Sequence, residues 1–269
     1  MPYMNNENCR IKEKPHQEGN MKTNRAGFTL VEMAIVLVIV GLLLGGLLMP
    51  LSMQVEQRRI SETQAALDEI KEALVGFAIA NGRLPCPAPA ATPIGVAGAG
   101  LEPTPVVAVG CASAAGVLPW ATLGVNETDA WGNRYTYRVT TEFTRIVPQS
   151  TFNGGAGCPP LTLNAAFALC SQGNMAMLNT GGGSILSSNV PVVVISHGKN
   201  GNGAYNTQGT QLPLGTDVDE QDNQLTTGGT ATANTNFVSK TPTATFDDLV
   251  VWLSPNILFN RMVSAQRLP

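Results

Sequence analysis

Apolar residues form one long, nearly uninterrupted run close to the N-terminus of the chain. Residues 28–51 read FTLVEMAIVLVIVGLLLGGLLMPL and carry a single charge, at Glu32. At about 1.5 Å per residue, a helix of this length crosses the roughly 30 Å hydrocarbon core of a bilayer. The pattern therefore predicts a transmembrane helix over residues 28–51.

The pattern after this run is that of an amphipathic helix. Apolar or small side chains recur at alternating steps of three and four, at Ile60, Thr63, Leu67, Ile70, Leu74 and Phe77. This spacing predicts that the helix continues over residues 52–82 and packs one narrow stripe on a domain. Asn81-Gly82 is a typical helix stop. Pro50 is expected to kink the helix, because proline lacks the N–H and clashes with the preceding turn.

Residues 83–269 show short, β-like runs separated by long loops. Alternating or β-branched residues predict strands at 134–139, 190–196 and 248–253. Glycine, proline and small polar residues predict loops over 86–118 and 207–242.

The C-terminal end carries a helix start signal. Ser254 is a suitable N-cap, and Pro255 suits the first helical position. With the elements above, this predicts an α+β fold in which a long N-terminal helix packs on a small antiparallel sheet with long loops.

The segment before the apolar run is basic. It contains five cationic residues and three acidic ones: Arg10, Lys12, Lys14, Lys22 and Arg25, and Glu7, Glu13 and Glu18. The positive-inside rule keeps residues 1–27 in the cytoplasm and sends the C-terminal domain across the membrane. A secretory signal peptide needs a small-residue cleavage site after the apolar run, and LLMPLSMQVEQ offers none. A plain membrane anchor leaves Glu32 unexplained, because a carboxylate inside a spanning helix costs about 2.5–3.5 kcal/mol.

Residues 25–32, RAGFTLVE, resemble the processing motif of type IV prepilins and type II secretion pseudopilins. In that family a basic leader ends in glycine, phenylalanine follows, and a glutamate lies four residues further on. The resemblance implies cleavage between Gly27 and Phe28 by prepilin peptidase and methylation of the new amine of Phe28. It also implies that this amine pairs with Glu32 of a neighbouring subunit. The leader is long for the family, so Met4 and Met21 are alternative starts.

The resemblance implies a filament subunit in the bacterial inner membrane, with a single span and a periplasmic C-terminal domain. Its partners are then prepilin peptidase, other pilins or pseudopilins and the assembly platform of the inner membrane. Two alternatives stay open: a minor tip pilin that binds a surface or DNA, and a membrane-tethered periplasmic binding module. Glu32 argues against the tethered module, which has no use for a carboxylate in the membrane.

The turn Asp129-Ala130-Trp131-Gly132-Asn133 resembles the D-P-W-G-N-P-Y turn of major pseudopilins. Ala130 and Arg134 stand where proline is commoner in that family. The resemblance favours a secretion pseudopilin over a type IV pilin. The length of the chain favours a minor subunit or a distinct subgroup.

Four cysteines remain after cleavage: Cys86, Cys111, Cys158 and Cys170. An even number on an exported domain predicts two disulfides. Three connectivities exist, and we favour Cys86–Cys111 with Cys158–Cys170 because each closes one loop.

Few residues suit catalysis. His197 is the single histidine after Gly27, and its neighbour Ser196 points to the opposite face of a strand. We expect His197 to be a loop residue that bonds the backbone, and no zinc site or phosphate loop is expected. The net charge of −3 offers no basic surface for nucleic acid. The chain is therefore expected not to be an enzyme.

Calcium is the one ligand that the sequence suggests. Asp217, Asp219 and Asp222 cluster in a stretch rich in glycine and asparagine. Carboxylates on a loop suit this cation, although the spacing is not that of an EF-hand. Major pseudopilins carry a calcium loop late in the domain, so the resemblance implies such a site here.

Overall fold

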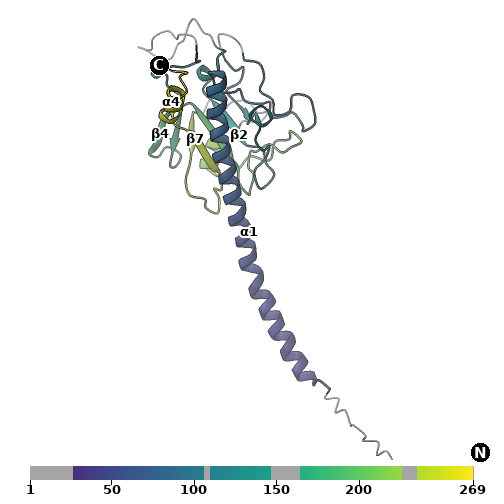
Figure 1. The fold of residues 1–269 in the computed structure, drawn as a ribbon. Coiled ribbons are helices and arrows are strands. Elements are labelled where there is room, and N and C mark those ends of the chain that lie inside the picture. The colour runs from purple at the N-terminus through teal and green to yellow at the C-terminus, as the bar shows by residue number, and fades with distance from the viewer. Residues whose placement is uncertain (1–26, 106–109, 147–163, 226–234, 269) are drawn as a thin grey trace, which may run out of the picture. The chain divides into compact units, whose positions relative to one another are not determined.

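A computed structural model describes residues 27–105, 110–146, 164–225 and 235–268, and within them the side chains of residues 45–52 lie outside the description. The chain divides into two units, Met1–Ser52 and Met53–Pro269. One helix, α1 (Leu30–Asn81), begins in the first unit and ends in the second (Figure 1).

The described part of the first unit is the beginning of α1. Its side chains from Leu30 to Leu44 are exposed and, apart from Glu32, uncharged. Within the part of the chain that the structure describes, no helix is both long and apolar enough to cross a membrane.

The predicted span 28–51 includes residues 45–51, whose side chains lie outside the described set. The transmembrane helix and the kink at Pro50 therefore stay predictions. The predicted helix stop is confirmed: α1 ends at Asn81, and Gly82 adopts a left-handed φ of 71° that glycine accommodates without strain.

The second unit, Met53–Pro269, is built around a four-stranded antiparallel sheet. Its strands are β1 (Ala115–Val117), β2 (Thr136–Val139), β5 (Val192–Ser196) and β7 (Leu249–Leu253), in the order β1-β2-β5-β7. The three predicted strands are confirmed as β2, β5 and β7. They pair directly, with Tyr137 opposite Val194 and Val194 opposite Val251.

A second sheet was not predicted from the sequence. It has the order β4-β3-β6 and consists of β3 (Met175–Leu178), β4 (Ile185–Val190) and β6 (Asn236–Val238). β3 runs parallel to β6, and its antiparallel ladder with β4 contains two register shifts. The prediction of one antiparallel sheet is therefore correct for the first sheet and incomplete for the domain.

Both predicted loops contain short regular elements. The stretch 86–118 includes β1, and 207–242 includes α3 (Val218–Asn223) and β6. Two further short helices, α2 (Trp120–Leu123) and the 3-10 turn η1 (Thr141–Thr144), flank β2. The predicted C-terminal helix is α4 (Pro255–Ser264), preceded by Ser254 as expected, although the Ser254 hydroxyl does not cap it.

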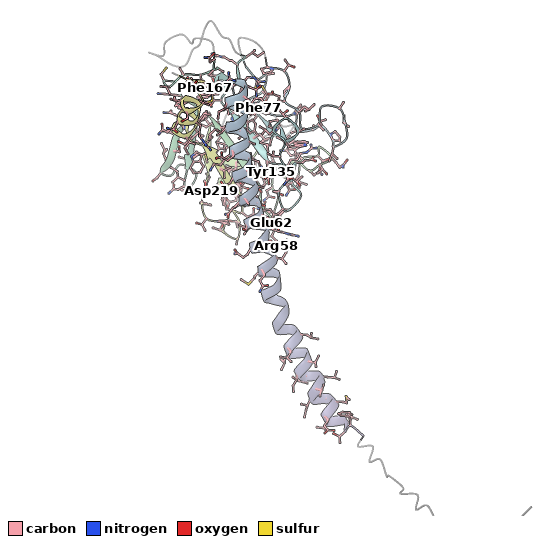
Figure 2. All side chains as sticks on the ribbon, in the orientation of Figure 1. Arg58, Glu62, Phe77, Tyr135, Phe167 and Asp219 are labelled. Atoms are coloured by element: carbon pink, nitrogen blue, oxygen red, sulfur yellow. A yellow bond between two sulfur atoms is a disulfide. The ribbon has the colours of Figure 1, made fainter. Side chains whose placement is uncertain are left out.

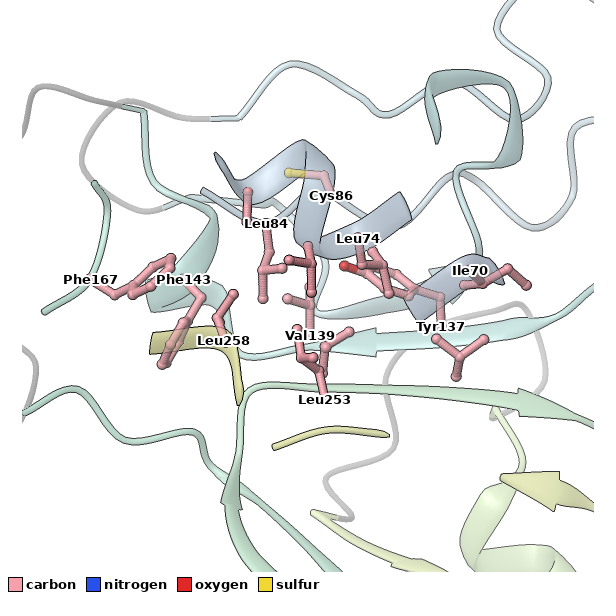
Figure 3. Close-up of a cluster of buried hydrophobic side chains, with 14 of the residues drawn as sticks. Ile70, Leu74, Leu84, Cys86, Tyr137, Val139, Phe143, Phe167, Leu253 and Leu258 are labelled. Atoms are coloured by element: carbon pink, nitrogen blue, oxygen red, sulfur yellow. The ribbon is translucent and has the colours of Figure 1, made fainter. Parts of the chain in front are cut away.

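The main core lies between α1, the four-stranded sheet and α4. Leu67, Ile70 and Leu74 of the predicted stripe are fully buried there, against inward-facing residues of β2, β5 and β7 (Figure 3). Burying each such side chain contributes about 1.5–3 kcal/mol. The phenyl rings of Phe143 and Phe167 cluster with that of Phe259 on α4.

The predicted stripe is wrong at its last position. Phe77, labelled on α1 in Figure 2, is only partly buried. The Arg83 guanidinium lies over its ring at 5.2 Å. Val75 and Ala78 face the core instead. The exposed side of the helix is polar, as predicted, with an ion pair of 2.8 Å between Arg58 and Glu62 one turn apart.

The C-terminal end of α1 is capped from a distance. Arg267, just after α4, donates from Nε to the Ile79 carbonyl at 2.6 Å and from Nη2 to the Ala80 carbonyl at 2.7 Å. These carbonyls have no partner within the helix, and they carry the negative end of its dipole. A residue at the far end of the domain therefore stabilises the end of α1.

Candidate functional site

The predicted cleavage junction precedes the first turn of α1. Gly27 and Phe28 are exposed and non-helical, and the side chain of Phe28 is 76% exposed. A Cβ at Gly27 would meet no described atom within 4 Å. The fold of this chain therefore does not require glycine at position 27, so any requirement for glycine there comes from another molecule.

Glu32 closes the first turn of α1 by a capping box, which the sequence reasoning missed. The Glu32 Oε2 atom accepts from the Thr29 backbone N–H at 2.8 Å and from the Thr29 hydroxyl at 3.0 Å. The Glu32 N–H donates in turn to Thr29 Oγ1 at 3.3 Å. The signal was present in the sequence, because Thr-x-x-Glu before an apolar run is the capping-box pattern.

The capping box involves one oxygen of Glu32. No contact to its Oε1 atom is found among the described residues, and the side chain is exposed in the isolated chain. One carboxylate oxygen is therefore available to a cation while the other holds the helix start.

The predicted disulfide Cys86–Cys111 is confirmed, with both residues buried in the main core. Cys170 is also disulfide-bonded. Its predicted partner Cys158 lies outside the described residues, so the pairing Cys158–Cys170 stays a prediction.

The turn at residues 129–133 is fixed by one buried carboxylate. Asp129 Oδ1 accepts from the backbone N–H groups of Trp131 at 3.0 Å and Asn133 at 2.9 Å. Its Oδ2 accepts from the Ser196 hydroxyl of β5 at 2.6 Å. Burial raises the pKa of Asp129, although these hydrogen bonds and the nearby His197 oppose the shift. The Ala130 N–H reaches Thr63 of α1 at 3.3 Å, so the turn joins helix to sheet.

His197 lies in the loop directly after β5, as expected, but it is fully buried, and its ring contacts side chains rather than the backbone. Its Nε2 lies 2.8 Å from Thr136 Oγ1, and its Nδ1 lies 3.4 Å from Asp248 Oδ1. A hydroxyl, an imidazole and a carboxylate in a row are the parts of a nucleophilic triad. All three residues are buried, so no substrate reaches this hydroxyl in the structure.

The three aspartates predicted to bind calcium have separate contacts. Asp217 caps α3, accepting from the N–H groups of Asp219 and Glu220. Asp219 is ion-paired with Lys240 and accepts from Gly181 N at 2.6 Å. Asp222 faces the same glycine. The structure does not gather the three carboxylates into one group that could hold a metal ion.

A different set of carboxylates does converge. Glu220, Asp247 and Asp248 each offer an oxygen within 4.8 Å of the others, which makes them the candidate cation group among the described residues. Burial, together with the charges of Glu220 and Asp248, raises the pKa of Asp247 to about 6. Glu220 and Asp247 are 27 positions apart in the chain, so the local spacing of residues in the sequence does not indicate this cluster.

The oxygens of this cluster are only partly satisfied by the chain. Glu220 accepts from the side-chain amides of Asn200 at 2.7 Å and Asn202 at 3.0 Å. Asp247 Oδ1 is buried without a hydrogen-bond partner, and the buried Asp248 Oδ1 makes no hydrogen bond although His197 Nδ1 lies 3.4 Å away. Buried carboxylate oxygens with free lone pairs, beside carboxamides that can turn their oxygens inward, suit a hard cation such as Ca²⁺.

The N-terminal region also matches a known family. A family model described as the prokaryotic N-terminal methylation motif matches residues 22–48, which include Gly27, Phe28 and Glu32. Searches of curated proteins and of solved structures find no match to this chain. The matched segment confirms the resemblance stated for residues 25–32.

Proposed function

We propose that this chain, which carries the prepilin-type cleavage and methylation signature, is a structural subunit of a pilus or pseudopilus filament. The match over residues 22–48 carries the proposal. Cleavage between Gly27 and Phe28 frees an amine at the start of α1. Assembly then joins the N-terminal helices of successive subunits. The role is structural rather than catalytic.

The geometry of the junction supports this processing step. The peptide bond between Gly27 and Phe28 is exposed and precedes the helix, so a peptidase can reach it before α1 constrains the backbone. A Cβ at position 27 would meet no described atom, so we attribute the requirement for glycine there to the peptidase. The open Oε1 atom of Glu32 supports an ion pair with the amine of Phe28 on a neighbour. That pair offsets two charges that are costly in hydrocarbon.

Within the family we favour a pseudopilin of a type II secretion-like system over a type IV pilin. The turn at 129–133, which bonds α1 through the Ala130 N–H and β5 through Asp129, supports this choice. We place the protein in the bacterial inner membrane with a single span and a periplasmic C-terminal domain. The disulfide Cys86–Cys111 supports export to an oxidising compartment.

We also propose a calcium ion at Glu220, Asp247 and Asp248, in place of the aspartates that the sequence suggested. The buried Oδ1 atom of Asp247, which has no hydrogen-bond partner, supports this assignment, because leaving such a group without a partner costs about 1–3 kcal/mol. Asn200 and Asn202 would supply further oxygen ligands if their carboxamides turned. The ion would join α3 to the start of β7.

The filament proposal is tested in cells that carry or lack prepilin peptidase. The expected result is a shorter chain and its recovery in sheared filaments when the peptidase is present, and a full-length membrane precursor when it is absent. Gly27→Leu should behave as the precursor does in both strains. Gly41→Leu, a matched change further along α1, should be processed normally. Equal processing of the two variants contradicts the proposal.

A further inference from the structure

The outer edge of β4 is unpaired among the described residues. β4 is the end strand of the sheet β4-β3-β6 and bonds to β3 on one side. No strand lies on its other side in the described part of the chain, and Figure 1 shows β4 at the margin of the domain. An end strand presents a row of backbone N–H and C=O groups that can pair with another strand.

Two other sheet edges of the domain are closed. At β6, the Asn223 side chain donates to the Val238 carbonyl and accepts from its N–H, both at 2.9 Å, as a neighbouring strand would. At β1, Ala88 and Val117 exchange two backbone hydrogen bonds. Residues of the domain therefore cover these two edges, whereas no described strand covers that of β4.

β4 also lacks the side chains that usually discourage edge pairing. Residues 181–196 contain no charged residue, and β4 itself contains no proline. Ile185 and Leu186 are 64% and 50% exposed, and because neighbouring residues point to opposite faces, both faces of the strand are apolar at this end. Natural edge strands are commonly protected by lysine or proline, so this edge favours association.

A pocket of about 450 Å³ lies beside β4 and is shared with the start of α4. Its lining includes Ser188, Asn189 and Asn256 and contains no charged side chain. An uncharged strand can therefore approach this edge without burying an unpaired charge, and the pocket has room for its side chains.

We propose that two copies of this chain pair through the outer edges of their β4 strands. A second copy is the occupant because its own β4 is an uncharged strand with a free edge. Two identical edges meet about a two-fold axis and run antiparallel. With the axis near Ser187, the serines face each other and can hydrogen-bond across the strands. Each copy has one such edge on this sheet, so the association closes at two.

The pairing does not require the filament function, and the two proposals fail in different experiments. If the chain is a filament subunit, its copies within one filament point the same way. A two-fold contact would then join subunits of two filaments.

The test uses charge exchange at an exposed position of the edge, with the full-length chain in detergent micelles. Ser188→Lys and Ser188→Glu each place like charges near one another across the two-fold axis. We expect either change to weaken the dimer at least about tenfold in dissociation constant. An equal mixture of the two variants should recover the dimer, because the two charges near the axis are then opposite in sign. Ser61→Lys, on an exposed position of α1, is the matched control and should leave the dimer unchanged.

A second readout fixes the location of the contact. Leu186→Cys, Ser187→Cys and Ser188→Cys are oxidised in turn, and at least one should give a covalent dimer on a non-reducing gel, while Ser61→Cys should not. A wild-type chain that is monomeric at about 100 μM overturns the proposal. So does a dimer that both charge variants leave intact, or a mixture that fails to recover. Thermal melts confirm that each variant is folded.

Discussion

Glu32 has two roles in this account, and they can be separated. Its Oε2 atom holds the Thr29 N–H in the capping box, and its charge is proposed to pair with the amine of Phe28 on the next subunit. Glutamine can close a capping box as glutamate does, but it carries no charge. The two substitutions Glu32→Gln and Glu32→Ala therefore distinguish a helix cap from an assembly contact.

We expect both variants to insert and to be cleaved, because removing a charge eases insertion and the peptidase acts at Gly27. Both should be lost from sheared filaments, although Glu32→Gln keeps the cap. The measurement compares membrane level, processing and filament yield with those of the wild type. Normal filament yield from Glu32→Gln would show that the cap, and not the charge, is what assembly needs.

Asp129 makes the stability of the domain depend on pH. Burial raises its folded-state pKa above the ordinary aspartate value of 3.8, so the folded chain binds a proton more tightly than the unfolded chain. Its contribution to the free energy of unfolding is largest below that ordinary value and decreases as pH rises through the raised pKa.

Asp129→Asn should remove this contribution, since asparagine does not titrate and its side-chain oxygen can still accept from the turn. Urea unfolding of both proteins between pH 4 and pH 8 gives the free energy of unfolding at each pH. The slopes of this free energy against pH are then compared between the wild type and the variant. A wild-type free energy of unfolding that rises relative to the variant over this range would contradict the assignment.

At the scale of elements, the end of α1 depends on Arg267. Arg267→Ala removes two charge-assisted hydrogen bonds to the last carbonyls of the helix and should lower the free energy of unfolding by about 1–2 kcal/mol. Arg261→Ala is the matched control. Its ion pair with Glu72 is largely exposed and contributes about 0–1 kcal/mol. Equal losses in the two variants would show that the cap adds nothing beyond an exposed ion pair.

The elements predicted well from the sequence are those with a long or regular pattern. The stripe from Leu67 to Leu74 identified the buried face of α1, and the β-branched run at 190–196 identified β5. α3 and β6 were missed because they span six and three residues, too few to show a period. Phe77 was misplaced because the Arg83 guanidinium covers its ring, a contact that no helical period encodes.

The acidic cluster was missed for a related reason. Glu220 comes from α3, whereas Asp247 and Asp248 precede β7, and the fold brings them together from distant positions. A run of aspartates such as Asp217 to Asp222 is visible in the sequence. In the structure, Asp217 caps a helix and Asp219 pairs with Lys240.

At the scale of the whole molecule, the calcium proposal predicts that the cation stabilises the folded domain. Addition of Ca²⁺ to chelator-treated protein should raise the melting temperature, by an amount that grows with concentration. Asp248→Asn should abolish the shift. Asp217→Asn should keep it, because asparagine caps a helix as well as aspartate does and Asp217 is outside the cluster. If only Asp217→Asn loses the Ca²⁺-induced shift in melting temperature, the ion binds at the aspartates suggested by the sequence and not at the cluster.

Whether the chain is a processed filament subunit is decided by the mass of its mature N-terminus. The protein is isolated from membranes of a host that carries prepilin peptidase, and its N-terminal peptide is analysed by mass spectrometry. We expect a chain that begins at Phe28 and carries one methyl group on its amine. A mature chain that begins at any other residue, or one that keeps residues 1–27, would contradict this expectation.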